Sequence, residues 1–452
     1  MKKVGWKHIY LALRRNPFTD GQPSIQLIWL YTIALAGSFF LLSALPVAFS
    51  NDSMGYVEAG KVFANGEIDI LRTPFYSLFC HSLLGLPFLG YKSIIICQYL
   101  LFLLSIQAFY HIAKWMIHAP ALRFIVSLAY ILHPGIILWH GMILTESLAI
   151  SGAVFLVYFM LCYSCCPSWK SAIAVGITFL TLLALRPSSI YLSPALGVFV
   201  GWALWKHRKY AGLLLAGCLL AALCTWSYCY AYQRKFGVFM PGYVTSLNQY
   251  WILRNTSIMQ PSDCDDADIR RHLEQYIAEE GDTRDSESFY KEFFFFIDTY
   301  GVKRTHRLVQ SSLEKHRVAY LSVLLKQAVE IRNFPAFTYY IDAEAMPLPL
   351  RLYVKLIFGI FTFHFHFIYL FLTGYAVAAF LWMKRHSLIS IMPCCLWMIV
   401  GANVSVSVFA AMGEWHRLIV PSMPLLFLMM AKAIDYCCVN KGYRSNPHLC
   451  KK

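Results

Sequence analysis

Charge is scarce in this sequence. Only 14% of its residues are charged and 58% are apolar, whereas an ordinary soluble domain carries about a quarter charged residues. That scarcity excludes an ordinary soluble enzyme. Several mostly apolar runs are long enough to cross a ~30 Å hydrocarbon core as helices. We therefore predict an all-α polytopic membrane protein.

Acidic residues are the rarer of the two charges, with 24 Asp and Glu against 39 Lys and Arg and a net charge of +15. In a soluble protein this balance would indicate nucleic-acid binding. In a membrane protein, basic residues instead hold loops on the cytoplasmic side. We therefore expect no nucleic-acid partner.

Patterns typical of disulfides, zinc sites and repeats are also lacking. The 14 cysteines lie mostly inside apolar runs, as in Cys394-Cys395, where cysteine behaves as a small hydrophobe. The absence of an internal repeat lowers the case for a secondary transporter. The first apolar run follows a basic lead without a small-residue cleavage site, so we expect it to be retained.

Ten apolar runs are predicted to form membrane helices. They cover about 25–49, 93–117, 121–138, 143–164, 170–185, 189–205, 211–232, 354–383, 388–410 and 416–435. The resulting domains are a basic cytoplasmic arm (1–24), a transmembrane core (25–232) with an outer loop (50–92), a mainly helical extramembrane segment (233–352), C-terminal transmembrane helices (353–435) and a cytoplasmic tail (436–452). With both termini inside, 18 basic residues flank the inner ends and five the short outer ends, as the positive-inside rule requires.

The first outer loop, Asn51 to Tyr76, is the most polar part of the first half of the chain. Tyr56, Ala59, Gly60 and Phe63 share one face of a helix there, so this loop is expected to hold an interfacial helix. Ionisable residues at membrane-helix ends are costly and are functional candidates. In the predicted topology they gather on the outer side: Asp52, Arg72, Glu146, Arg186, Glu414, His416 and Arg417.

Carboxylates and arginines together suit a site that activates a hydroxyl group and holds a phosphate. Structural explanations stand beside this interpretation. Asp52 is placed to cap the following helix, and Glu146 is placed to complement a helix dipole. Glu414 and Arg417 have the spacing of a local ion pair, and Arg186 could extend to the interface.

The order of these residues resembles that of the GT-C superfamily of polytopic glycosyltransferases, which includes the protein O-mannosyltransferases and the bacterial lipid A aminoarabinose transferase. The resemblance covers 25–232 and, more loosely, 354–435. Ser53 stands where many members carry a second acid. The shared elements are Asp52, Tyr56, Ala59, Gly66, Arg72 to Tyr76, Pro134 with Thr145-Glu146, Arg186, and Glu414 to Arg417 with Pro421 and Pro424.

The resemblance implies a GT-C-like fold and a hexosyl- or pentosyltransferase. Such an enzyme would move a sugar from a polyprenyl-phosphate donor to a hydroxyl of an envelope glycan, lipid or protein. Asp52 would be the general base, and Glu146 would orient hydroxyls or bind a divalent cation, although no metal or cofactor is expected to be required. The residues expected to bind substrate and lipid phosphate are Tyr56, Arg72, Tyr76, Arg186, Glu414, His416 and Arg417.

The expected location is a bacterial plasma (inner) membrane, with the active site on its outer face. Three alternatives stay open from the sequence. They are a transporter or flippase of lipid-linked sugars, a glycan polymerase or ligase that uses a lipid-diphosphate donor, and a non-enzymatic assembly factor.

Overall fold

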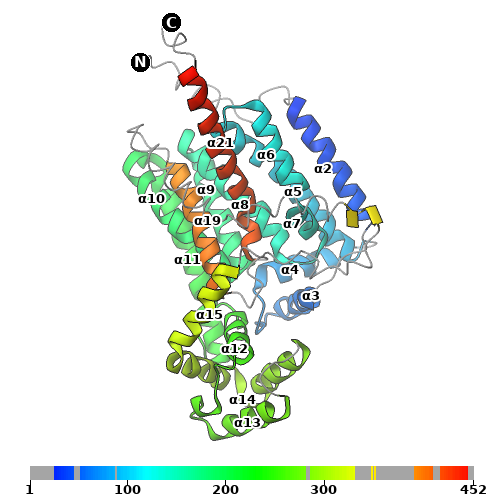
Figure 1. The fold of residues 1–452 in the computed structure, drawn as a ribbon, viewed down its shortest axis with the longest axis vertical. Coiled ribbons are helices and arrows are strands. Elements are labelled where there is room, and N and C mark those ends of the chain that lie inside the picture. Colours follow the sequence, from blue (N-terminus) through cyan, green and yellow to red (C-terminus); the bar gives the residue numbers. More distant parts are fainter. Residues whose placement is uncertain are drawn as a thin grey trace.

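The computed structural model describes residues 25–44, 51–86, 89–280, 286–330, 348–349, 351–352, 391–410 and 418–445. Across these ranges the chain is almost entirely helical and contains no β-strand. Figure 1 shows a bundle of long helices and a smaller helical lobe that extends from one end of the bundle. The predicted all-α class is confirmed.

The bundle combines helices from both halves of the chain. Its helices are α2 (Ile25–Ala44), α5 (Tyr91–Met116), α6 (Pro120–Leu132), α7 (Pro134–Ile137), α8 (Thr145–Cys165), α9 (Trp169–Leu185), α10 (Ser193–Lys206), α11 (Arg208–Phe236), α19 (Ile391–Ala410) and α21 (Met423–Ser445), with the 3-10 helices η1 (Leu138–Gly141), η2 (Pro187–Leu192) and η5 (Val420–Ser422).

Two predicted helices differ from the observed ones because of proline. The predicted helix 121–138 is interrupted, and the chain bends between α6 and the α7–η1 segment that starts at Pro134. Proline lacks a backbone donor and clashes with the preceding turn, which explains this break. The predicted helix 189–205 begins only at Ser193, because η2 precedes it.

Several predicted boundaries move in the structure. α11 continues to Phe236 instead of 232, and α21 continues to Ser445, into the predicted cytoplasmic tail. The predicted helix 354–383 and the basic arm 1–24 lie outside the described residues.

Four described segments are long and apolar enough to cross a membrane: α5, α8, η2 with α10, and α11. The bent pair of α6 with the segment after Pro134 makes a fifth if it counts as one span. Shorter apolar helices lie within α2, α9 and α19. The chain is therefore a multi-pass membrane protein, and the total of ten spans stays a prediction.

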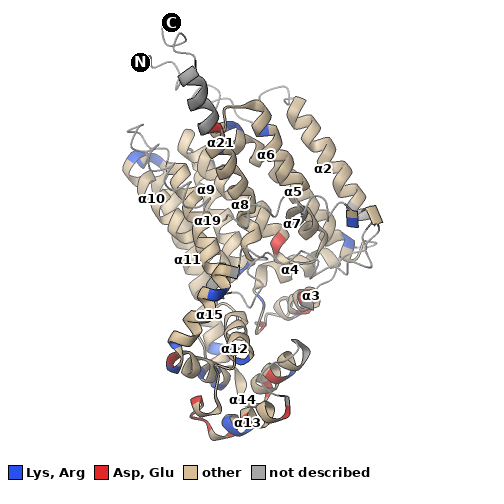
Figure 2. Cartoon of the chain, in the orientation of Figure 1, with Lys and Arg blue, Asp and Glu red and all other residues tan. Residues whose placement is uncertain are grey.

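The interior of the bundle is apolar. One continuous core of buried side chains joins α5, α6, α8, α9, α10, α19 and α21, and Figure 2 shows that charged residues gather at the bundle ends and in the lobe. α9 and α11 approach closely where a Cβ added at Gly176 would lie 3.0 Å from the Cα of Gly217. Small residues at such crossings let helix backbones meet, which is how apolar helices gain contact in a membrane.

The lobe has its own hydrophobic core. It consists of α12 (Val244–Asn255), η3 (Pro261–Asp263), α13 (Ala267–Glu280), α14 (Ser286–Lys315) and α15 (Arg317–Glu330). Aromatic side chains such as Tyr243, Tyr250 and Phe293 are buried in this core. Arg254 Nε lies 3.1 Å from Glu292 Oε1 and joins α12 to α14 through a buried ion pair. These helices fall inside the expected segment 233–352, while the domain boundaries themselves stay predictions.

Two short helices lie at the end of the bundle that carries the lobe, α3 (Asn51–Ala64) and α4 (Pro74–Leu84). The expected helical face of α3 is buried at Tyr56, Ala59 and Gly60 and partly buried at Phe63. It packs on α4, because a Cβ added at Gly60 would lie only 2.9 Å from the Cβ of His81. The predicted loop helix is therefore present, and its apolar face is occupied by another helix of the protein.

Candidate functional site

The first ion pair of the site joins Asp52 and Arg72. Asp52 lies in the first turn of α3, where a carboxylate complements the helix dipole. Arg72 Nη2 lies 2.7 Å from Asp52 Oδ1, and the two side chains are 13% (Arg72) and 27% (Asp52) exposed. The Arg72 guanidinium also lies over the ring of Tyr56, with its Cζ 4.4 Å from the ring centroid. This pair is therefore held in place yet remains reachable from outside the protein.

Backbone geometry fixes Arg72 in that position. The carboxylate of Asp69 accepts hydrogen bonds from the backbone N–H groups of Leu71 (2.8 Å) and Arg72 (2.6 Å), as in an Asx turn. A Cβ at Gly55 would lie 3.2 Å from Arg72 Nε and Nη2. A glycine on α3 thus gives the guanidinium room to lie across the helix.

The second ion pair joins Glu146 and Arg186. Glu146 lies in the first turn of α8, and Arg186 follows the end of α9 in an extended conformation. Pro187 disfavours helical geometry at the residue before it, which ends α9 at Leu185. Arg186 Nη2 lies 3.5 Å from Glu146 Oε1, and the side chains are 8% (Arg186) and 0% (Glu146) exposed.

Arg186 has a further polar atom that the described residues do not satisfy. Its Nη1 is buried and has no hydrogen-bond partner among the residues that the structure describes. Leaving a buried charged donor unpaired costs more than a lost neutral hydrogen bond. Such a donor next to a carboxylate is suited to a second anion that enters the site.

The two ion pairs lie next to each other through Thr73 and Tyr76. Thr73 Oγ1 donates to the carbonyl of Leu185 at 2.9 Å, so the residues after Arg72 and before Arg186 are bonded together. Tyr76 contacts Tyr56 edge to face, with ring centroids 5.0 Å apart. The four charged residues therefore form one site at the end of the bundle.

Gln98 completes this arrangement, and the sequence analysis did not select it. Tyr76 Oη donates to Gln98 Oε1 at 2.7 Å. Gln98 Nε2 donates to the carbonyls of His140 (3.0 Å) and Met142 (2.8 Å). The glutamine thereby connects α4 to the turn that precedes Glu146. Its one visible signal was an amide side chain in the apolar helix 93–117, which also contains Gln107.

His140 also braces the start of α8. Its Nδ1 lies 2.6 Å from Ser147 Oγ, and its ring stacks on Phe102 with centroids 4.3 Å apart. Both polar groups are buried. The His140–Ser147 contact therefore ties the turn 140–144 to the first turn of α8, in addition to the two hydrogen bonds from Gln98.

Six of the nine predicted site residues fall in the described parts of the chain, and all six belong to this site: Asp52, Tyr56, Arg72, Tyr76, Glu146 and Arg186. The other three, Glu414, His416 and Arg417, lie outside the described residues. The described chain resumes at Leu418, and η5 packs against α8. The roles assigned to all nine residues stay predictions.

Within the described ranges, no group of three or more His, Cys, Asp and Glu side chains is arranged to hold a metal ion. Each of the two carboxylates of the site is paired with an arginine. Of these two, Glu146 is fully buried and Asp52 is partly exposed. Asp52 is thus the carboxylate that an incoming molecule can reach.

Comparison with known proteins gives little further information. No protein-family model and no curated protein matches the chain. A solved structure that matches is the archaeal oligosaccharyltransferase AglB from Archaeoglobus fulgidus, in complex with an inhibitory peptide and a dolichol-phosphate, with 11% identity and a TM-score of 0.45. The match covers 98% of this chain and 52% of that protein, so the chain spans about half its length. At this TM-score the likeness does not establish a shared fold.

Proposed function

We propose that this protein is a membrane glycosyltransferase that moves a sugar from a polyprenyl-phosphate donor to an acceptor hydroxyl. The observation that carries the proposal is the buried Arg186 guanidinium, which is paired with Glu146 on one side and has an unsatisfied Nη1 among the described residues. A phosphate on a lipid carrier supplies the anion that such a donor requires, and it reaches the site from the surrounding bilayer.

The phosphate would be bound as a leaving group. Charge-assisted hydrogen bonds from arginine are about twice as strong as neutral ones, and the planar guanidinium matches phosphate geometry. In a water-poor site such donors stabilise the charge that develops in the transition state. Of the two candidate arginines that the structure describes, Arg186 is the more deeply buried. Tyr56 and Tyr76 lie next to Arg72.

The transfer step would be a single displacement. The acceptor oxygen attacks the anomeric carbon, its proton passes to the Asp52 carboxylate, and the bond from the anomeric carbon to the phosphate oxygen breaks. The electron pair of that bond leaves with the lipid phosphate, next to Arg186. The configuration at the anomeric carbon is inverted. Asp52 suits the role of base because it is the partly exposed carboxylate of the site.

Glu146 would hold Arg186 in place and orient hydroxyl groups of the sugar or acceptor. Its carboxylate is fully buried beside the guanidinium, and the turn before it is fixed by Gln98 and His140. A divalent cation is not required by this mechanism. The site is proposed to face the outer side of a bacterial plasma membrane.

The main alternatives differ in what they need from the bundle. A transporter of lipid-linked sugars needs access from both faces, whereas the described bundle interior is filled by apolar side chains. A polymerase or ligase would use a lipid diphosphate at a similar site. Whether the donor is a lipid monophosphate or a lipid diphosphate therefore distinguishes the proposed glycosyltransferase from a polymerase or ligase.

The proposal is tested by the acid-to-amide variant Asp52→Asn. Purified protein is placed in proteoliposomes that contain the lipid extract and envelope acceptors of the source cells, and mass spectrometry follows conversion of glycosylated polyprenyl phosphate to polyprenyl phosphate. Removing a general base should slow conversion by about 10²- to 10⁴-fold.

The matched control is Glu58→Gln, an acid-to-amide change at an exposed position of the same helix, which should leave the rate near wild type. Conversion at the wild-type rate by folded Asp52→Asn protein would remove Asp52 as the base. Consumption of a lipid diphosphate instead of the monophosphate would favour the polymerase or ligase.

A further inference from the structure

We propose that α15 is an interfacial helix, with an apolar strip that inserts into the phospholipid leaflet next to the site and anchors the lobe to the bilayer. This inference concerns a part of the chain that the proposed reaction does not use, and it does not depend on that reaction. The partner surface is the boundary between phospholipid headgroups and acyl chains.

The helix divides into a protein-facing side and an exposed side. Tyr320 and Leu324 are buried in the core of the lobe, and Ala328 packs against the core of the bundle. α15 therefore runs from the lobe to the bundle and also contacts α19. In Figure 1 it lies where the lobe meets the end of the bundle.

The exposed side carries four large apolar residues in one strip. Val318, Leu321, Leu325 and Val329 are 82%, 50%, 67% and 55% exposed. Their spacing of three and four residues places them on a single face of the helix. An exposed apolar strip of this kind marks a contact surface.

Polar residues lie beside the strip. Ser322 and Lys326 are exposed, and at about 100° per residue they fall on the flank next to Leu325 and Val329. Arg317 is exposed at the start of the helix. A helix with an apolar strip and basic borders is typical of the membrane interface, where basic side chains meet lipid phosphates.

The level of the bilayer surface can be inferred from α11. Its exposed apolar residues end in Trp226 and Tyr230, which are 57% and 48% exposed, and are followed by the basic pair Arg234 and Lys235. Aromatic residues concentrate at the membrane–water interface.

The same turns of α11 hold the loop of the candidate site. Tyr232 Oη donates to the carbonyl of Ile70 at 2.8 Å. The interface therefore passes at the level of the site, where the lobe begins and α15 reaches the bundle (Figure 1). Ala328 and the contact with α19 place the C-terminal end of the α15 strip next to the bundle at this level.

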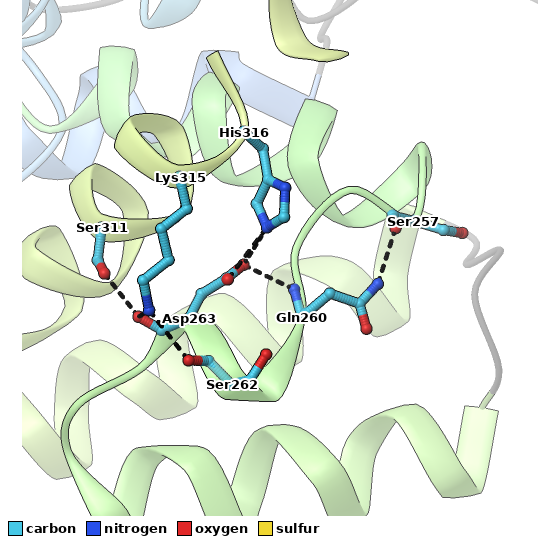
Figure 3. Close-up of polar contacts among 7 residues, drawn as sticks. All are labelled: Ser257, Gln260, Ser262, Asp263, Ser311, Lys315 and His316. Carbon is cyan, nitrogen blue, oxygen red and sulfur yellow. Dashed lines mark hydrogen bonds and ion pairs between the residues drawn. The ribbon is translucent and has the colours of Figure 1, made fainter. Parts of the chain in front are cut away.

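The residues at the start of α15 are bonded to η3 of the lobe (Figure 3). A membrane contact made by α15 would therefore hold the whole lobe. His316 Nε2 lies 3.0 Å from Asp263 Oδ1, and Lys315 Nζ donates to the carbonyls of Ser262 (3.0 Å) and Asp263 (3.1 Å). Asp263 itself is buried and accepts from the Gln260 N–H at 2.9 Å. These bonds fix the junction between α14 and α15.

The test places p-benzoyl-phenylalanine at position 325 of the full chain in liposomes of phosphatidylethanolamine and phosphatidylglycerol. After illumination, mass spectrometry identifies what the probe has joined. We expect phospholipid adducts at position 325, and also at position 321 in a second variant. A matched probe at position 326, about 100° around the helix, should give several-fold fewer lipid adducts.

Two results would overturn the proposal. One is equal lipid labelling at positions 325 and 326. The other is a probe at 325 and 321 that joins mainly protein, either the 353–390 segment of the same chain or a second copy. Because these positions are exposed, the probe is expected to leave folding intact, and the two variants check each other.

Discussion

Arg186 is the residue of the candidate site whose surroundings leave room for a ligand. The guanidinium lies almost fully inside an apolar bundle, and Glu146 at 3.5 Å accounts for one of its two terminal nitrogens. Burying charge without full pairing is costly, and breaking such a pair destabilises a protein by roughly 3–5 kcal/mol. A lipid phosphate that completes the pairing would make the same residue both a binding and a catalytic group.

Donor affinity should depend on both the charge and the shape of this side chain. A charge-assisted hydrogen bond is worth about 1.5–3 kcal/mol, so Arg186→Ala should weaken polyprenyl phosphate binding by roughly 10- to 100-fold. Arg186→Lys should fall between Arg186→Ala and wild type, because it keeps the charge and loses the planar fork. The measurement is titration of the purified protein in nanodiscs with polyprenyl phosphate.

Arg234→Ala is the matched control, because Arg234 is exposed at the end of α11. It should bind the lipid like wild type. Equal affinity of all four proteins would show that Arg186 is not part of a phosphate site.

The sequence could predict which residues meet at this site, since apolar runs and charge bias place them at one end of the bundle. It could not predict how they pair. Asp52 and Arg72 are joined across a loop whose shape depends on Asp69 and on room at Gly55. The hydrogen bonds from Tyr76 to Gln98 and from Gln98 to the carbonyl of Met142 could not be predicted either. They join residues far apart in the sequence, and they depend on the orientation of a buried amide.

Among the elements, the crossing of α9 and α11 depends most visibly on small residues. The backbones of the two helices approach at Gly176 and Gly217, and Leu185 at the end of α9 accepts the bond from Thr73. The position and tilt of α9 in the bundle therefore determine where the Arg186 side chain lies in the site. A side chain at this crossing would push the two helices apart.

Gly176→Leu should destabilise the protein by about 1–3 kcal/mol, the usual effect of overpacking. Thermal unfolding in detergent measures the change. The matched control is Gly197→Leu on α10, where an added Cβ meets nothing within 4 Å. It should be neutral or slightly stabilising, because leucine favours helix over glycine. Similar melting of both variants and wild type would show that close packing at Gly176 is unimportant.

The positions of the helices were largely predictable from the sequence. A long apolar segment in a membrane must satisfy its backbone hydrogen bonds internally, and a helix does this. The exceptions have local causes. Pro134 and Pro187 break or delay helices through their missing donors and fixed geometry. α11 extends beyond its apolar run because the loop around Ile70 and the lobe supply partners for its last turns.

At the scale of the whole molecule, the charged residues divide between two opposite ends. The site and the lobe lie at one end. At the other, His118 Nδ1 lies 2.9 Å from Asp435 Oδ2, and Lys432 Nζ lies 3.5 Å from the same carboxylate oxygen. This arrangement agrees with a site on a single side of the membrane, while the orientation itself stays a prediction.

If both proposals hold, the lobe, the interfacial contact of α15 and the site belong to an enzyme that works at one membrane surface. In that enzyme the lobe, which lies next to the site, would receive the acceptor on the water side. The donor would enter from the lipid side, beside Arg186. The two substrates would thus reach the site from opposite sides, the donor from the lipid and the acceptor from the water.

The most direct measurement of that claim is mass spectrometry of envelope glycans and glycolipids from a strain that lacks this protein and carries either wild type or Asp52→Asn. We predict that one hexose, pentose or amino sugar is missing without the protein, is restored by wild type only, and accumulates on polyprenyl phosphate in the other two strains. Identical glycans and glycolipids in all strains, or full restoration by Asp52→Asn, would contradict the account.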